Sequence, residues 1–172
     1  METIDIYNNN IQKTGKIANR KSRLLDGEYR LIVHLVIFDD NRMLIQKRSE
    51  NVNSFKGKWD ISSGGGVVAN EDAINAIKRE TKEELGIEID NIKPLITFYC
   101  EHEIDIIYYI NYQLSDFKKT KDVSEIKYAT KEEIINLIDN DEFVKYKKEI
   151  IETIFSFQID FNEYNDKAWE NE

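Results

Sequence analysis

Cysteine, proline and histidine are scarce in this sequence of 172 residues, which contains one, one and two of them respectively. Because Cys100 has no second cysteine to pair with, an intramolecular disulfide is excluded and a reducing, cytoplasmic location is expected. No stretch rich in proline or in glycine and serine marks a linker. We therefore expect one domain over residues 1–159, with a leader hairpin at 1–26, and a loosely ordered acidic tail at 160–172.

Long apolar runs and a surplus of positive charge are missing as well. No run of apolar residues is long enough to span a bilayer, and Met1–Asp5 lacks the basic start of a signal peptide. The net charge of −9 gives no support for binding a nucleic-acid polymer, which usually requires a basic patch. An acidic enzyme can still act on anionic phosphates, but a cation must then be present in its site.

The hydrophobic pattern predicts strands mixed with a few helices, which indicates an α/β sandwich. A hairpin is expected within residues 3–17, and further strands over 30–38, 43–47, 59–63, 95–101, 106–114 and about 125–129. Three glycines, Gly64–Gly66, are expected to stop the strand that begins at Trp59. Helices are expected from Asn70 to Gly86, from the capping box at Thr130, and over about 143–158.

The first of these helices carries the chemistry. One stripe of the helix should pack on the sheet, and it consists of Ile74, Ile77, Thr81 and Leu85. A neighbouring face gathers the carboxylates of Glu80, Glu83 and Glu84. Such a face is often simply solvated. Here, however, a glycine-rich loop precedes it, and clustered carboxylate and backbone oxygens suit a hard cation such as Mg²⁺.

The segment from Gly65 to Ile87 resembles the Nudix box of the MutT-like hydrolases. The pattern is Gly, five residues, Glu, seven residues, Arg-Glu, an apolar residue, any residue, Glu-Glu, any residue, Gly and an apolar residue. This sequence places there Gly65, Glu71, Arg79, Glu80, Thr81, Glu83, Glu84, Gly86 and Ile87. Only Thr81 departs from the pattern. The resemblance covers roughly residues 1–138 and implies a Nudix α/β/α sandwich with a mixed sheet, in which the box forms loop–helix–loop.

The resemblance also implies a function and a role for each residue of the box. It implies a pyrophosphohydrolase that uses Mg²⁺, or Mn²⁺ in its place, to cleave a diphosphate linkage in a small molecule, most simply a nucleoside diphosphate derivative. Glu83, Glu84 and the carbonyl of Gly64 would bind the metal, and Glu80 would be a further ligand or the general base. Arg79 would orient the catalytic carboxylates, with Glu71 supporting it.

Residues outside the box are assigned less sharply. A later acid, Asp122 or Glu125, would complete the metal site or act as base, although either fits a plain surface acid. Arg48 is interpreted either as a residue that contacts the diphosphate or as an ordinary cation at the end of a strand. His34 fits a packed histidine or a pocket wall, and Cys100 a small core residue. Aromatic residues that fit either base stacking or the core are Trp59, Phe98, Tyr99 and Tyr109.

The leader and the Trp59-Asp60 pair resemble a Nudix subgroup related to isopentenyl diphosphate isomerase. The isomerases need a catalytic cysteine and metal-binding histidines near this loop, whereas Ser62–Gly66 contains neither residue type. An isomerase-like enzyme is therefore the runner-up, followed by a Nudix module that binds a nucleotide without cleaving it. The leader hairpin also suits the interface of a homodimer, which many members of the family form.

Overall fold

The computed structural model describes residues 2–111, 117–118 and 120–167, with side chains as far as residue 157. Its strands are β1 (Thr3–Tyr7), β2 (Lys13–Asn19), β3 (Arg30–Asp39), β4 (Arg42–Arg48), β5 (Trp59–Ile61), β6 (Ser63–Gly66), β7 (Lys93–Cys100), β8 (Glu103–Asn111) and β9 (Val123–Thr130). Its helices are α1 (Ala73–Leu85), α2 (Lys131–Asp139) and α3 (Lys148–Lys167). None of the described helices has the length and apolarity that a membrane span requires.

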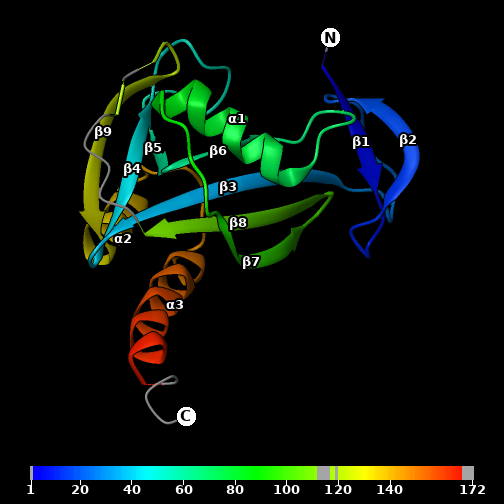
Figure 1. The fold of residues 1–172 in the computed structure, drawn as a ribbon. Helices are drawn as coiled ribbons and strands as arrows, with labels where there is room; N and C mark the ends of the chain where they lie inside the picture. The colour runs from blue at the N-terminus through cyan, green and yellow to red at the C-terminus, as the bar shows by residue number, and fades with distance from the viewer. Residues whose placement is uncertain (1, 112–116, 119, 168–172) are drawn as a thin grey trace.

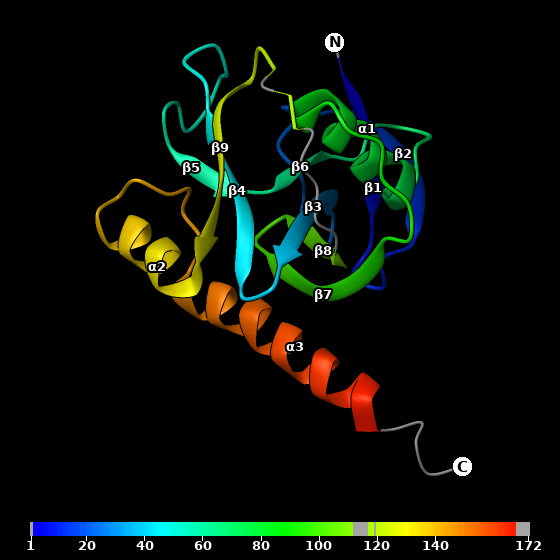
Figure 2. The same cartoon turned by 60° about the vertical axis from the view of Figure 1, so that its left-hand side comes forward.

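β3 is the central strand of a mixed sheet. It pairs with β8 in parallel from Arg30 to Phe38, whereas the other pairs in this sheet are antiparallel. β3 and β4 pair only at the Phe38–Asp39 end of β3 and diverge from there. In the resulting gap, which we call the wedge, β5 pairs with β4 and β6 pairs with β3 (Figures 1 and 2). The wedge interrupts the sheet and leaves room for side chains from a helix.

Alternate residues of β3 face two separate apolar cores, as the nearly continuous apolar run predicts. On one side α1 covers the core that contains Leu31, Val33, Leu35, Ile37, Ala76, Ile77 and Leu85. On the other side α2 and α3 cover the core that contains Val36, Phe38, Ile134, Ile151 and Ile154. Figure 1 shows α1 above the sheet and α3 below it. The predicted α/β/α sandwich is confirmed.

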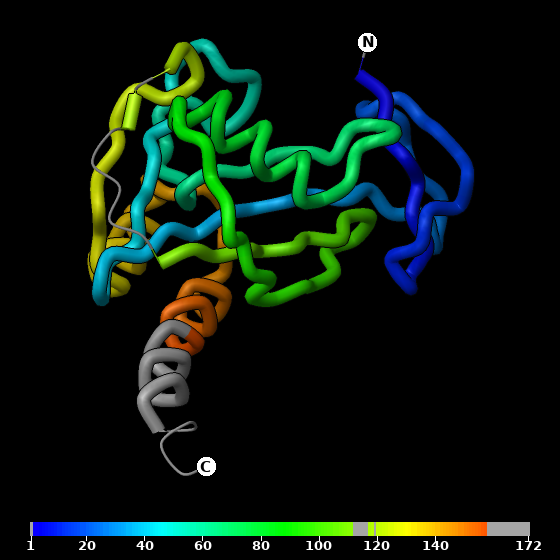
Figure 3. Tube along the Cα trace, in the orientation of Figure 1, coloured from blue at the N-terminus to red at the C-terminus, as the bar shows by residue number. Residues whose placement is uncertain are grey.

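The N-terminal hairpin, β1 and β2, forms a two-stranded sheet of its own at one end of β3 (Figure 3). A small core of Ile4, Ile6 and Leu24 holds it together. Reciprocal backbone hydrogen bonds of 2.9 Å between Tyr7 and Tyr29 attach the hairpin to the segment before β3. The hairpin is therefore fixed against the main sheet, next to the glycines of β6.

Three local predictions are wrong. The strand that begins at Trp59 ends at Ile61, before the glycines, and Gly64–Gly66 form most of a further strand, β6, because β3 offers them a backbone partner. Helix α1 is capped by Asp72, whose side chain accepts a hydrogen bond from the Asn75 N–H, and not by Asn70, whose φ is +67°. Its end at Gly86, with φ +70°, is confirmed.

The third difference concerns the last helix, which begins at Lys148 and not near residue 143. The backbone around Phe143 pairs with Trp59 instead: the Trp59 N–H donates to Glu142 and the Val144 N–H donates to Trp59, each at 2.8 Å. Pairing with β5 therefore outweighs the helical pattern of this segment. The backbone of α3 then continues past the predicted end at 158 to Lys167.

Candidate active site

Arg79 lies at the centre of the polar contacts of α1. Its Nε–H and one Nη2–H donate to the two carboxylate oxygens of Glu71, each at 2.9 Å. Nη1 donates to Glu80 at 2.7 Å, and Nη2 also donates to the carbonyl of Gly66 at 3.1 Å. The hydrogen bonds that Arg79 donates to Glu71 raise the pKa of Arg79 further, against the effect of its partial burial. One guanidinium thus fixes two carboxylates relative to β6.

Glu80 lies directly against the backbone of Gly65. A Cβ on Gly65 would stand 2.3 Å from the carboxyl carbon of Glu80, so a glycine is required for this approach. The Glu80 side chain is 14% exposed. Burial raises the pKa of Glu80, and the contact with Arg79 offsets only part of that effect. Glu80 is therefore a partly desolvated carboxyl group held at one position.

Glu84 enters the wedge between β4 and β6. One of its carboxylate oxygens accepts hydrogen bonds from Gln46 Nε2 at 2.9 Å and from the Gly64 N–H at 3.0 Å. Burial raises the pKa of Glu84 to about 8, despite these two hydrogen bonds. The negative charges of Asp60 and Glu80 add to the increase. The anionic form of Glu84 thus lacks a compensating cation among the described residues.

The register of β6 shows where the carbonyl of Gly64 points. The Val67 N–H donates to the Leu31 carbonyl at 3.0 Å, so Val67 and Leu31 form a hydrogen-bonded pair. Hydrogen-bonded and non-hydrogen-bonded pairs alternate along an antiparallel ladder. Gly64 and His34, three pairs further on, are therefore a non-hydrogen-bonded pair whose backbone groups point away from each other. Accordingly the Gly64 N–H donates to Glu84 and not to β3. In an extended strand the N–H and C=O of one residue point to the same side, so the Gly64 carbonyl faces the side of β6 where Glu84 lies.

These oxygen atoms fit a hard divalent cation. The described residues contain no ready-made group of three or more His, Cys, Asp or Glu side chains around one point. Glu83 differs from Glu80 and Glu84, because its side chain is 58% exposed and lies 3.6 Å from Arg79. Glu80 and Glu84 nevertheless lie against consecutive glycines of β6, and burial raises the pKa of both. Crowded, desolvated carboxylates beside a backbone carbonyl are typical Mg²⁺ donors.

A pocket of about 540 Å³ lies where β6 meets the α3 side of the sheet. Its lining includes the cations Arg20, Arg48, Lys145 and Lys147, the acids Asp60, Glu103 and Asp105, and the aromatic residues Phe55, Phe98, Tyr99 and Tyr146. His34 lies behind Gly64, where a Cβ would come within 2.7 Å of its Nδ1. Because neighbouring residues of a strand face opposite ways, β6 has Glu80 on one face and this pocket on the other.

Buried polar pairs form the inner wall of the pocket. His34 Nε2 lies 2.8 Å from Asp105, and the Tyr146 hydroxyl lies 3.1 Å from His34 Nδ1. Arg48 donates to Asp60 at 3.1 Å. Burial raises the pKa of Asp60, although the charges of Arg48 and His34 oppose this change. This wall offers hydrogen-bonding groups to a polar ligand beside the glycine backbone.

Comparison with known proteins identifies this arrangement. The family model described as the NUDIX domain matches residues 28–153. An uncharacterised Nudix hydrolase of Listeria innocua is 34% identical over 152 residues, which cover 85% of this chain and 90% of that protein. This chain belongs to the Nudix hydrolase family.

Solved structures agree on the Nudix fold. The crystal structure of DR0079 from Deinococcus radiodurans has a TM-score of 0.74 and 24% identity, and the match covers 88% of this chain and 98% of that one. The NUDIX domain of Shewanella oneidensis NrtR, cocrystallised with ADP ribose, has a TM-score of 0.58 and 17% identity, with 79% and 90% covered. At these identities the likeness concerns the fold.

The packed stripe of the Nudix helix is confirmed at three of its four positions. Ile77, Thr81 and Leu85 are fully buried, whereas Ile74 is 40% exposed, so that part of the prediction is wrong. A helical wheel gives the direction of Ile74 around the axis but not whether the sheet extends under the first turn. The departure at Thr81 is accommodated, because its hydroxyl donates to the Ile77 carbonyl and contacts Ser63 Oγ, each at 2.7 Å.

Outside the Nudix box, the structure separates the alternatives for several residues. Arg48 and His34 both line the pocket. Trp59 and Tyr109 are core residues, whereas Phe98 and Tyr99 line the pocket. The prediction for Cys100 is wrong: it is exposed, because it ends β7, an edge strand, at the turn into β8.

The two later acids do not line the pocket next to the Nudix helix. Asp122 accepts a backbone hydrogen bond from Ser49 through its carbonyl, and Glu125 pairs with Lys47 at 2.9 Å. Their assignment as a further ligand or base stays a prediction. The pocket instead contains Asp105 and Tyr146, which sequence reasoning missed. A charged residue inside the apolar run of β8 was the available signal for Asp105.

Proposed function

We propose that this Nudix hydrolase uses Mg²⁺, or Mn²⁺ in its place, to cleave the diphosphate linkage of a nucleoside diphosphate derivative by attack of water at phosphorus. The observation that carries the proposal is the fixed placement of Glu80 and Glu84 against Gly64 and Gly65, beside a pocket with cationic and aromatic walls. A carboxylate cluster cannot receive a polyanion without a cation, so a metal is needed for this geometry to work on phosphates.

The charged residues that the box pattern specifies, and Gly64 just before the box, each have a part in the proposed reaction. Glu83, Glu84 and the Gly64 carbonyl would hold the metal, which when bound lowers the pKa of water and offsets charge on the phosphate oxygens. Glu80 would be a further ligand or would accept the proton of the attacking water. Arg79 would keep Glu80 in one orientation, and Glu71 would keep Arg79 in place through the two-point contact.

The pocket supports a nucleotide-derived substrate. Phe98, Tyr99 and Tyr146 offer aromatic surfaces for a base, and Asp105 offers oxygen acceptors for hydroxyl groups. ADP ribose is the ligand of the related NUDIX domain of Shewanella oneidensis NrtR, so this compound belongs in the first test. A cytoplasmic location, suggested by the lone cysteine, and a homodimer built on the leader hairpin are further parts of the proposal.

The test is a panel of nucleoside diphosphates and triphosphates, ADP ribose, dinucleotides and non-nucleotide diphosphates with Mg²⁺, followed by phosphorus NMR. We expect a cleaved phosphoanhydride bond in at least one compound. EDTA should abolish turnover, and added Mg²⁺ or Mn²⁺ should restore it. Full activity after exhaustive chelation would contradict the metal-dependent proposal, and binding without cleavage of any compound would favour a non-catalytic module.

The same preparation tests the isomerase alternative. The pocket does contain His34 and Cys100, but they come from β3 and β7 and not from the glycine strand. His34 is also engaged by Asp105 and Tyr146. We expect no exchange of deuterium from heavy water into isopentenyl or dimethylallyl diphosphate. Enzyme-dependent isomerisation would reverse the order of the two alternatives.

A further inference from the structure

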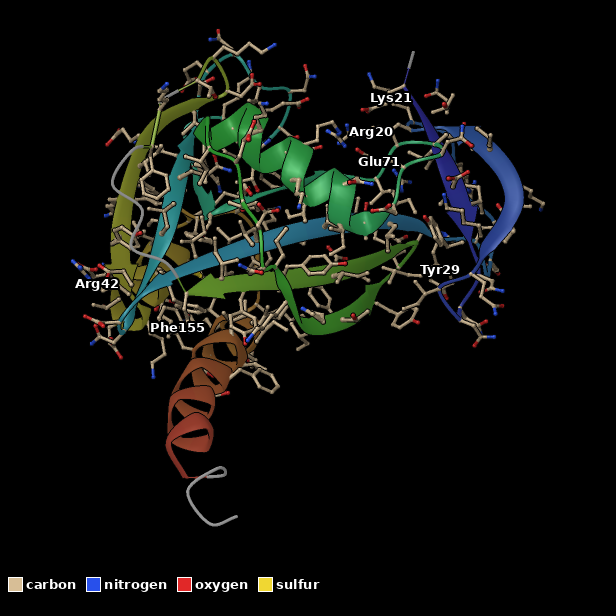
Figure 4. The ribbon with its side chains drawn as sticks, viewed as in Figure 1. Arg20, Lys21, Tyr29, Arg42, Glu71 and Phe155 are labelled. Carbon is tan, nitrogen blue, oxygen red and sulfur yellow. The ribbon has the colours of Figure 1, made fainter. Side chains whose placement is uncertain are left out.

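Arg20 reaches the Nudix site from outside the matched domain. It follows β2 in the N-terminal hairpin, whereas the NUDIX match begins at residue 28. The end of its side chain lies over Gly66, where a Cβ would stand 3.6 Å from the guanidinium carbon. It lines the same pocket as Gly64 and Gly65. Figure 4 labels Arg20 and Glu71 at the end of α1 that faces the hairpin.

The backbone of Arg20 is held in place while its side chain is half free. The Arg20 N–H donates to the carbonyl of Glu2 at 3.1 Å, and Arg30 Nη1 donates to the carbonyl of Arg20 at 3.0 Å. The side chain is 49% exposed. Its Nη1 pairs with Glu2 at 2.6 Å, whereas Nε and Nη2 make no hydrogen bond to a described residue. Two donors of the guanidinium therefore remain available.

The surroundings of Arg20 are those of an anion site. The positive charge of Arg20 is close enough to lower the pKa of Glu80, the carboxylate proposed as a metal ligand or general base. The second guanidinium near these glycines, that of Arg79, is occupied by Glu71, Glu80 and the Gly66 carbonyl. Arg48, across the pocket, is occupied by Asp60 and the Ser54 carbonyl. Of these three arginines, Arg20 is therefore the one whose guanidinium can donate hydrogen bonds to a phosphate group beside Gly64 and Gly65.

We propose that Arg20 binds a phosphate group of the substrate, so that the N-terminal hairpin forms part of the active site. This inference rests on the proposed function and deepens it. Glu2 is the competing anion: its carboxylate pairs with Arg20 Nη1, and a phosphate group would share or displace it. A guanidinium suits this task because its planar fork can donate two parallel hydrogen bonds to phosphate oxygens.

The alternative is that Arg20 merely ties the hairpin together through Glu2, and a pair of variants separates the two roles. Arg20→Gln removes the charge in both cases. Glu2→Gln removes the tie but frees Arg20 for phosphate. If Arg20 binds phosphate, the two variants act in opposite directions; if Arg20 is only structural, they act in the same direction. Lys21→Gln, a neighbouring exposed residue that does not line the pocket, is the matched control.

Two readouts are measured for each variant: binding of inorganic diphosphate in the presence of Mg²⁺ by calorimetry, and KM and kcat for the best compound of the panel. We expect Arg20→Gln to weaken diphosphate binding and raise KM by about 10-fold, the lower end of the worth of a charged hydrogen bond, because the side chain is half exposed. Glu2→Gln should strengthen binding, Arg20→Lys should restore part of it, and Lys21→Gln should change neither readout.

The outcomes also distinguish this inference from the proposed function. If the wild type hydrolyses a compound and Arg20→Gln changes KM and diphosphate binding less than about twofold, the inference is overturned and the hydrolase assignment stands. If the wild type cleaves nothing in the panel but binds diphosphate through Arg20, the proposed function fails and the inference stands. A wild type that neither cleaves nor binds diphosphate overturns both proposals. A Glu2→Gln variant that loses diphosphate binding to the same extent as Arg20→Gln overturns the inference alone.

Discussion

The carboxyl group of Glu80 occupies the space that a Cβ on Gly65 would need, at 2.3 Å. The flanking glycines differ in this respect. A Cβ on Gly64 would stand 2.8 Å from the Val33 carbonyl, which is backbone and cannot move aside easily, whereas a Cβ on Gly66 would meet Arg20 at an ordinary contact distance of 3.6 Å. Three consecutive glycines therefore differ in what an added methyl group would disturb.

We expect three different results from three alanine variants. Gly65→Ala should fold with little loss of stability, since the Glu80 side chain can move away, but turnover should fall by roughly 10²–10⁴-fold if Glu80 is the base. Gly64→Ala should lower the melting temperature, because backbone must shift. Gly66→Ala should have the smallest effect on both the melting temperature and the turnover rate. Thermal melts and steady-state rates check this order, and a fully active Gly65→Ala variant would contradict the placement of Glu80.

A second prediction concerns the pH dependence of stability of the metal-free protein. Burial raises the folded-state pKa of Glu84 from 4.5 to about 8, so ionising Glu84 costs stability as the pH rises between these two values. Glu84→Gln removes this ionisation while its amide oxygen can still accept the hydrogen bonds of Gln46 and Gly64. We expect Glu84→Gln to be more stable than the wild type in EDTA at pH 8 and similar to it near pH 4. Urea titrations at several pH values measure the difference.

The addition of Mg²⁺ supplies the control for Glu84. The wild type should gain stability from the metal because only the folded state gathers the ligands. Glu84→Gln should gain much less. Equal stabilisation of both proteins by Mg²⁺ would mean that Glu84 is not a ligand.

A third prediction separates metal binding from base catalysis on α1. Glu83→Gln should weaken Mg²⁺ binding, since it replaces a charged oxygen ligand by a neutral one. Glu80→Gln should reduce turnover by roughly 10²–10⁴-fold with a smaller change in metal affinity, if Glu80 is the base. Metal titrations and rates for both variants test this division. A fast Glu80→Gln enzyme combined with an inactive Asp122 or Glu125 variant would move the base to the later loop.

The part of the site that the sequence predicts is the part that repeats along one helix. Glu80, Glu83 and Glu84 share a face because the helical period puts them there, and Gly86 ends α1 for the same local reason. The sandwich architecture and the positions of the strands along the chain follow from apolar patterns with the helical and the strand period. The pocket is different. Asp105 and Tyr146 meet His34 from β8 and from the segment before α3, and no local period brings such distant residues together.

The errors have a common physical cause as well. Gly64–Gly66 belong to a strand, and Phe143 leaves its expected helix, because each segment finds a backbone partner elsewhere in the chain. Local propensity cannot anticipate a partner that the tertiary fold supplies. The N-terminal Arg20 escaped notice for the same reason, since its hairpin lies far from the Nudix box in sequence and beside it in space.

A fourth prediction follows from the exposure of Cys100. Cys100 lines the pocket and is exposed, so a thiol reagent such as Ellman's reagent should label the native protein completely without denaturant. A bound substrate of the proposed class should slow the labelling because it fills the same pocket. Cys100→Ser gives the background. Labelling that requires urea would contradict the exposure, and labelling that no substrate slows would place the ligand elsewhere.

The last prediction concerns Thr81, the position where this chain departs from the Nudix pattern. The Thr81 hydroxyl and Ser63 Oγ are 2.7 Å apart, and both residues are fully buried. Thr81→Val removes the partner of Ser63 and should cost about 1–3 kcal/mol of stability, the usual cost of a buried polar group left unpaired. Ser63→Ala should cost less, because Thr81 still donates to the Ile77 carbonyl. The double variant, which restores the apolar residue of the family pattern together with an apolar partner, should be more stable than Thr81→Val alone. Urea denaturation of the four proteins gives the coupling energy, and a double variant whose losses simply add would show that the two hydroxyl groups do not depend on each other.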